Sequence, residues 1–185
     1  MSTTINARQV LDFALLQSAA ECYFNDAERL SNEEYIRERL TEGANKAELQ
    51  GEGKAYNADI LRGATRLTDT QIDYFLANYE IVTHYPNDAS GFSCTLFRNI
   101  HTGAYTLSFR STEYQFQNKG GDYERDGSEG ADGDINEYGF ALAQLSSMEE
   151  FYANLKEGKT YSTVTGQWET NDALLQGKKL YSVKT

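Results

Sequence analysis

The residues whose types could support chemistry gather where a predicted strand ends, in the stretch GAYTLSFRSTE. Side chains along 104–110 alternate in polarity, which is typical of a half-buried strand. Arg110 closes this strand, and Ser111, Thr112 and Glu113 follow it with groups that need hydrogen-bonding or charged partners. Two interpretations remain open. Either the strand ends at a reacting centre, or Arg110 and Glu113 tie its end to a neighbouring element.

Few other residues offer a nucleophile or a base. The chain has two histidines, His84 after the apolar stretch EIVT and His101 in the turn NIHTG, and neither position favours catalysis. The nearest approach to a G-x-S-x-G nucleophile elbow is GFSCT around Ser93, which lies inside a predicted strand and lacks the second glycine. The fingerprints HExxH, CxxC, GxGxxG and GxxxxGK[ST] do not occur, so no metal or cofactor is expected.

One acidic segment resembles the start of a calcium loop, because Asp132, Asp134 and Asn136 alternate along it. The glycine expected at the sixth loop position is Glu137, and the glutamate expected at the twelfth is Ala143. The alternative is a solvated acidic stretch that enters a helix, where Asp and Asn favour the N-terminus. A calcium-binding module therefore stays open as a lesser hypothesis.

Composition limits the classes of partner. The 185 residues are 39% apolar and 24% charged, which is typical of one globular domain spanning the chain. The net charge of −11 argues against nucleic acid and anionic membrane surfaces as partners. No apolar run is long enough to predict a transmembrane helix. No signal peptide starts the sequence, which predicts a cytoplasmic protein or one secreted by a C-terminal signal outside this chain.

The first part of the chain, 1–79, is predicted to be mainly helical. Residues 7–25 form a helix that is apolar over much of its surface and therefore mostly buried, with Cys22 on its apolar stripe. Capping-box spacing predicts a second helix from Ser31, which has Glu34 three residues on, and a third over 69–80.

The rest of the chain, 80–185, alternates strands and helices. A hairpin is predicted from strands 91–99, which contains Cys94, and 104–110, and a long acidic loop covers 114–136. A helix follows over 136–159 and a last strand over 179–184. The buried stripe of that helix is predicted to be Ala141, Leu145, Met148, Tyr152 and Leu155. The fold class is therefore α/β, with N-terminal helices, a β-hairpin and a βαβ unit. Both cysteines are expected to be buried and free rather than joined in a disulfide.

Three elements in this order resemble the class 3 lipases, which are α/β-hydrolases, and most closely their bacterial branch. Phe109, Arg110 and Thr112 match the family's Phe-Arg-Gly-Thr strand end. Gly139 and Phe140 match its Gly-Phe helix start, and KLYSVKT resembles the strand that leads to its nucleophile elbow. The resemblance covers roughly residues 80 to 185 and implies a partial α/β-hydrolase fold.

The resemblance implies a role in ester hydrolysis. Thr112 takes the position whose backbone N–H and hydroxyl help form the oxyanion hole, and Ser111 replaces the glycine of the family motif. No nucleophile can be assigned, because the 185 residues contain no G-x-S-x-G. We therefore expect the N-terminal portion of a lipase or esterase for carboxylic, lipid-like esters, inactive as this chain. The alternative is a non-catalytic interaction module that keeps part of the hydrolase fold. An exposed sheet edge would allow self-association.

Overall fold

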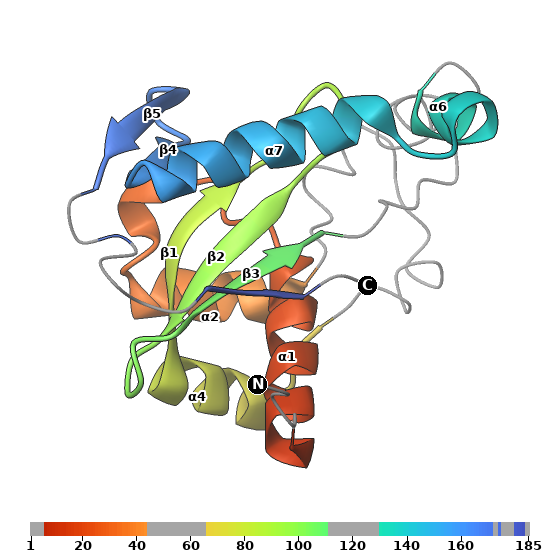
Figure 1. The fold of residues 1–185 in the computed structure, drawn as a ribbon. Helices are drawn as coiled ribbons and strands as arrows, with labels where there is room; N and C mark the ends of the chain where they lie inside the picture. Colours follow the sequence, from red (N-terminus) through yellow and green to blue (C-terminus); the bar gives the residue numbers. More distant parts are fainter. Residues whose placement is uncertain (1–5, 44–65, 111–129, 172–173, 175–179, 184–185) are drawn as a thin grey trace, which may run out of the picture.

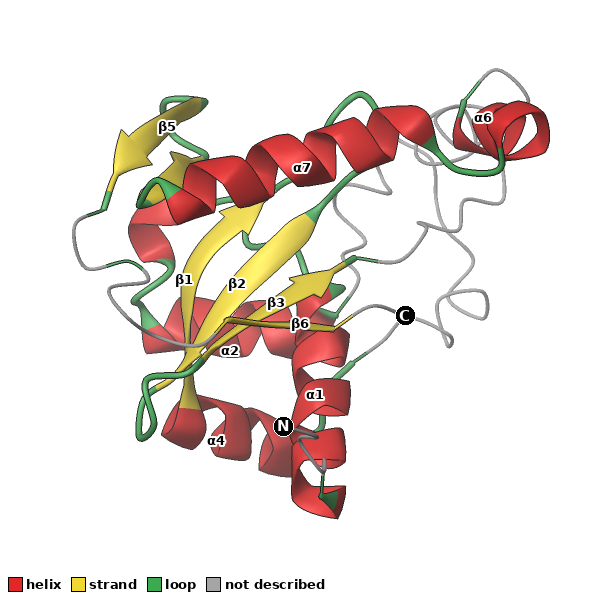
Figure 2. Cartoon of the chain, viewed as in Figure 1, coloured by secondary structure: helices red, strands yellow, loops and turns green. Residues whose placement is uncertain are grey.

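The structure is a computed structural model, and it describes residues 6–43, 66–110, 130–171, 174 and 180–183. Figures 1 and 2 show the main sheet crossed by α7 on one face and backed by N-terminal helices on the other. The helices, in chain order, are α1 (Ala7–Ala20), the 3-10 turn η1 (Ala27–Arg29), α2 (Glu33–Glu42), α4 (Asp69–Asn78), α6 (Ala131–Tyr138) and α7 (Leu142–Lys156). The strands are β1 (Tyr79–Tyr85), β2 (Cys94–Asn99), β3 (Tyr105–Phe109), β4 (Lys159–Ser162), β5 (Gln167–Thr170) and β6 (Leu180–Val183).

The main sheet has the strand order β1-β2-β3-β6. Strands β1, β2 and β3 pair antiparallel, and β6 returns parallel to β3. This arrangement confirms the mixed α/β character, the predicted hairpin and the parallel pair. Strand β1 was not predicted, because its residues follow α4 directly and the third helix was expected to reach residue 80. The separate β4–β5 hairpin was not predicted either.

Side-chain caps set the starts of α1, α2 and α4. The capping box of α4 is confirmed, with reciprocal bonds between Thr68 and Gln71. The predicted start of the second helix at Ser31 is wrong by one residue, because Asn32 is the cap and its side chain accepts from the Tyr35 N–H at 2.9 Å. Asx and hydroxyl caps differ little in preference, so neighbouring Ser and Asn are hard to rank from sequence alone.

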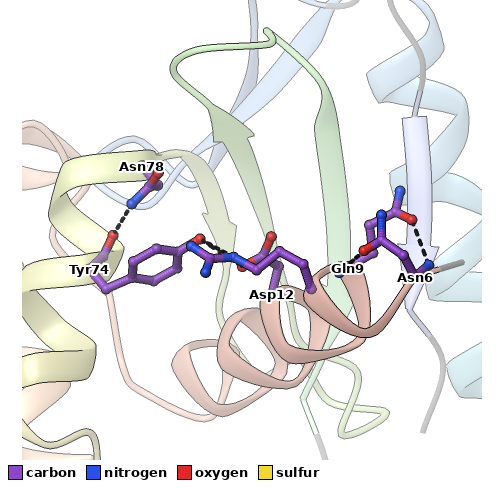
Figure 3. A network of polar contacts seen from close by, with 6 residues as sticks. Asn6, Gln9, Asp12, Tyr74 and Asn78 are labelled. Atoms are coloured by element: carbon purple, nitrogen blue, oxygen red, sulfur yellow. Dashed lines mark hydrogen bonds and ion pairs between the residues drawn. The ribbon is translucent and has the colours of Figure 1, made fainter.

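A polar network fastens α1 to α4 beneath the sheet (Figure 3). The hydroxyl of Tyr74 donates to Asp12 Oδ1 at 2.8 Å and accepts from Arg8 Nε at 3.1 Å. On the same helix, Asn78 Nδ2 donates to the backbone oxygen of Tyr74 at 2.7 Å. Burial, followed by the bond to Asp12, raises the pKa of Tyr74. The hydroxyl therefore stays protonated and serves as both donor and acceptor between the two helices.

The core has two parts, one on each face of the sheet. The part under α1, α2 and α4 includes Leu16, Phe75 and Phe97, and the part under α7 includes Leu107 and Leu155. The expectation of a mostly buried first helix holds only for its second half. Leu11 is 67% exposed, and the helix ends at Ala20 rather than near residue 25.

The long C-terminal helix departs from its predicted stripe. Gly139, with φ at 87°, ends α6 in the left-handed region, so the chain forms two helices where one was expected from residue 136. Leu155 is fully buried as predicted, but Leu145 is 38% exposed and Tyr152 is 44% exposed, while Phe151 is buried. The helix meets the sheet only along its C-terminal half, and periodicity alone does not show which part of a helix is covered.

Candidate functional site

The candidate site lies at the carboxyl end of β3, where the sequence placed its polar cluster. The described residues reach Arg110 and resume at residue 130. Ser111 and Thr112, the two residues predicted to serve an oxyanion hole, lie outside the described residues, as does Glu113. Their roles therefore stay predictions, and the geometry below concerns the residues that lead up to them.

Arg110 joins the strand end to the N-terminal helices. Its backbone N–H donates to the oxygen of Ser93 at 2.9 Å, which continues the pairing of β2 with β3 beyond the strands. Its guanidinium carbon lies 3.6 Å from the ring centroid of Tyr23, shortly after α1 ends. A guanidinium stacked on a tyrosine ring gains cation–π attraction. Arg110 therefore anchors the strand end, which agrees with the interpretation that it ties the strand to a neighbouring element.

Three buried polar side chains lie side by side across the sheet, and we call them the polar row: His84, Thr95 and Ser108. His84 pairs with Thr95 in register, and Thr95 pairs with Ser108. Residues opposite one another in a sheet project from the same face, and here it is the face covered by α1. All three are 0% exposed. His84 Nδ1 lies 2.9 Å from Thr95 Oγ1, and Phe24 packs edge-on against the imidazole.

Burial and Arg110 set the protonation of the groups around the row. Burial, reinforced by the charge of Arg110, lowers the pKa of His84 to about 3. Burial raises the pKa of Cys22 to about 12, and the charge of Arg110 opposes this rise. At neutral pH the imidazole is therefore neutral and the thiol protonated. The protonated Cys22 thiol is not in its nucleophilic form, and the neutral His84 imidazole carries no extra proton to donate as a general acid.

Several buried polar atoms near this strand end have no hydrogen-bond partner among the described residues. They are His84 Nε2, Ser108 Oγ and Gln17 Oε1. The amide nitrogen of Gln17 donates to the Phe109 oxygen at 2.7 Å, so α1 also binds the end of β3. An unsatisfied buried polar group costs about 1–3 kcal/mol, and such groups often accept a water or a ligand. The strand end is thus held by α1 and remains rich in polar atoms.

The serine of the nearest elbow-like stretch is already engaged. Ser93 is buried, and its hydroxyl donates to the Tyr85 oxygen at 2.8 Å. It directly precedes β2, which begins at Cys94 rather than at residue 91 as expected, and no helix follows it. Within the described ranges, no serine is hydrogen-bonded to a histidine. His101 lies exposed in the hairpin turn, with Nε2 3.0 Å from the Ala77 oxygen.

The acidic stretch is helical, which contradicts the calcium-loop hypothesis as far as the described residues reach. Asp132, Asp134 and Asn136 lie in α6, where a loop was expected up to residue 136. Asp134 accepts a weak bond from the backbone N–H of Ala143 at 3.4 Å, in the first turn of α7. Among the residues that the structure describes, no three His, Cys, Asp or Glu side chains gather to hold a metal ion. Asp132 and Asp134 lie in the first turn of α6, where the helix dipole favours acidic side chains, as the alternative interpretation of this stretch proposed.

Both cysteines are buried and free, as predicted. Burial raises the pKa of Cys94 well above its usual range as well. None of the helices in the described part of the chain is long and apolar enough to cross a membrane.

The polar row was missed at the sequence level. His84 was treated as an isolated residue because β1 was not recognised, yet the stretch EIVTHY is rich in the β-branched and aromatic residues that favour strands. With β1 paired to β2, His84 would have been placed beside Thr95.

Comparison with known proteins does not assign the chain to a family. No protein-family model matches the chain, and neither a curated protein nor a solved structure matches it significantly.

Proposed function

We propose that this chain is the N-terminal portion of a serine hydrolase for carboxylic esters, and that β3 carries the oxyanion side of the catalytic centre. One observation supports the proposal above the others. Strand β3 ends at the polar cluster and has β6 as its parallel neighbour, with α7 between them in the sequence. The resemblance to class 3 lipases implies this order. In such sheets, ligands bind beyond the carboxyl ends of parallel strands.

The residues of this chain would position the reacting ester rather than attack it. Thr112 would offer its backbone N–H and hydroxyl to the carbonyl oxygen as that oxygen becomes negative. Arg110, fixed on Tyr23, and Gln17, bonded to the Phe109 oxygen, would hold the strand end still. A rigid strand end matters because donors for a developing charge act best when no reorganisation is needed. The nucleophile and its base would come from outside the described residues.

The test is hydrolysis of short-chain nitrophenyl esters. Residues 1–185 alone should show no turnover above a denatured control, because they contain no G-x-S-x-G. The same chain extended by its own downstream coding sequence should hydrolyse these esters. In the extended chain, Thr112→Val should lower kcat by about 10²–10³ if the hydroxyl contributes to the oxyanion hole. Thr106→Val, which changes a buried threonine of β3, is the matched control and should leave kcat within about twofold.

Two results would contradict the proposal. Robust turnover by residues 1–185 that Thr112→Val does not change would refute both the family reading and the role of Thr112. A natural stop codon just after residue 185 would favour the second candidate, a non-catalytic interaction module. The engagement of Ser93 with the backbone, and the neutral buried His84, favour that candidate for the described residues taken alone.

A further inference from the structure

Large apolar side chains gather on the surface of α6 and α7. Of the ten that are exposed in the described part of the chain, six lie between residues 135 and 152. They are Ile135, Tyr138, Phe140, Leu142, Leu145 and Tyr152. Single exposed apolar side chains are ordinary on a protein surface, whereas a concentration of them indicates a surface that contacts another molecule.

Helix α7 has an apolar face besides the one that docks on the sheet. Phe151 and Leu155 are buried in the core part under α7. Leu142, Leu145 and Tyr152 lie outside that core and are 41%, 38% and 44% exposed. Figure 1 shows α7 crossing the sheet and continuing past it toward α6. The exposed apolar side chains therefore belong to a second face of α7, which the sheet does not cover.

The spacing of this second face is that of a seam between two helices. Its residues follow one another at intervals of 3, 4, 3 and 4 positions, and all of them are exposed. We call them the α7 stripe: Leu142, Leu145, Glu149, Tyr152 and Lys156. Side chains three and four positions apart lie on one side of a helix, and strict alternation of the two intervals gives the narrow seam along which helices pack side by side. The stripe therefore fits another α-helix.

The charges of the stripe indicate what the other helix carries. Glu149 lies in the middle of the stripe, and its carboxylate has no hydrogen bond or ion pair with any residue that the structure describes. Lys156 lies at the C-terminal end, with Nζ 5.6 Å from the ring centroid of Tyr152. Between residues 130 and 157 the chain has six carboxylates, and Lys156 is the single cation. A basic side chain opposite Glu149 would complement this surface.

A second copy of this chain is a poor occupant of the α7 stripe. In a parallel pair in register, or in an antiparallel pair centred on the stripe, Glu149 would face its own counterpart. Like charges facing each other across an interface cost binding free energy, and each copy carries a net charge of −11. The same charge disfavours an anionic membrane surface. The complementary occupant is therefore a different polypeptide with basic character.

We propose that the α7 stripe binds an amphipathic helix of a different protein, one with apolar side chains at 3-4 spacing and a lysine or arginine opposite Glu149. Leu142, Leu145 and Tyr152 pack between the apolar side chains of that helix and supply the affinity. The ion pair with Glu149 fixes the register, as single polar positions do in coiled coils. This interaction does not depend on ester hydrolysis.

The test uses two labelled helical peptides of about 21 residues, or six helical turns, and fluorescence anisotropy with residues 1–185. Both peptides carry leucine at 3-4 spacing, and they differ only at the central seam position. That position is lysine in the Lys-centre peptide and glutamate in the Glu-centre peptide. The Lys-centre peptide should bind at least about tenfold more tightly, because its lysine pairs with Glu149. A scrambled Lys-centre peptide without the 3-4 spacing should also lose at least about tenfold.

A charge exchange separates the contact at Glu149 from general attraction to an acidic protein. Glu149→Lys should reverse the preference, so that the Glu-centre peptide binds more tightly. Glu34→Lys, which changes an exposed residue of α2, is the matched control and should leave the preference unchanged. The preference is a ratio of two affinities of the same variant, so it does not depend on the folded fraction.

A second pair of variants locates the apolar contact. Leu145→Ser should weaken the binding of both peptides by about fivefold or more, because it removes an apolar side chain from the seam. Val10→Ser changes a side chain that is 55% exposed on α1, and it should leave both affinities unchanged. Circular dichroism shows whether each variant is folded.

The proposal fails if Glu149→Lys keeps the preference for the Lys-centre peptide, or if the scrambled peptide binds as well as the Lys-centre peptide. It fails equally if neither peptide binds at millimolar concentration. Self-association that Leu145→Ser abolishes would assign the stripe to a second copy. Binding to phosphatidylcholine vesicles that Leu145→Ser abolishes would assign it to a lipid surface, and either result would overturn the proposal.

Discussion

Leu155 and Leu145 lie on the same helix, α7, but only one of them is buried, and this difference makes a sharp test of how α7 docks. Leu155 is 0% exposed and packs in the core part that contains Phe151, Leu96 and Leu107, whereas Leu145 is 38% exposed. Shortening a buried leucine to alanine loses about 0.8 kcal/mol of hydrophobic free energy for each methyl or methylene group removed, and it also leaves a cavity. Leu155→Ala should therefore cost about 2–5 kcal/mol of unfolding free energy.

Leu145→Ala is the matched control and should cost less than about 1 kcal/mol. Shortening the exposed Leu145 side chain leaves no enclosed cavity, and alanine has a higher helix propensity than leucine. Urea unfolding followed by circular dichroism measures both variants. With a slope of about 1–3 kcal/mol per molar urea, a difference of at least about 1 kcal/mol between the variants should separate the two midpoints by at least about 0.3 M at an unchanged slope. Equal midpoints would refute the docking of α7 by its C-terminal half.

Three further predictions concern protonation, thiols and caps. The pKa of His84 is about 3 in the folded chain and about 6.5 in the unfolded chain. Between these two pH values only the unfolded chain binds the extra proton, so the unfolding free energy should fall as the pH falls from about 6.5 toward 3. His84→Gln should remove up to about 1.4 kcal/mol per pH unit of that slope, and His101→Gln is the matched control. If the unfolding free energy depends on pH in the same way for His84→Gln and for the unmodified chain, the burial of His84 is contradicted. Cys22 and Cys94 should react with Ellman's reagent at pH 8 only after urea unfolding, since both thiols are buried and protonated, and rapid labelling of the native chain would be inconsistent with this. Thr68→Ala should lower the unfolding free energy by about 1 kcal/mol through loss of the cap on α4, and no change in the urea midpoint would argue against the capping box.

Short-range sequence patterns predicted the helix start and the hairpin that depend on neighbouring residues alone. The capping pair Thr68 and Gln71 set the start of α4, and alternation around the turn at His101 predicted the β2–β3 hairpin. The break at Gly139 was not predicted, because a glycine inside a periodic pattern is often tolerated within one helix. Here the glycine adopts the left-handed conformation that commonly ends a helix, and its N–H bonds to the Ile135 oxygen.

The candidate site depends on contacts that sequence patterns do not carry. The strand end at Arg110 was recognised as polar, but its partner Tyr23 is far away in the sequence, in the segment that follows α1, and the polar row needs the pairing of three strands. Leu145 shows the same limit, since its place in a periodic stripe predicts a buried face without showing how far the sheet extends beneath it.

The parallel pairing of β3 with β6 has a consequence for the order in which the chain folds during synthesis. Strands β1, β2 and β3 follow one another closely and can pair as soon as they leave the ribosome, whereas β6 must close a loop that runs from Phe109 to Leu180. With roughly 70 residues in the loop, closure costs about 4 kcal/mol of chain entropy before any contact forms. Until then the outer edge of β3 is available to other strands. This topology predicts a slow refolding step that depends on the docking of β6.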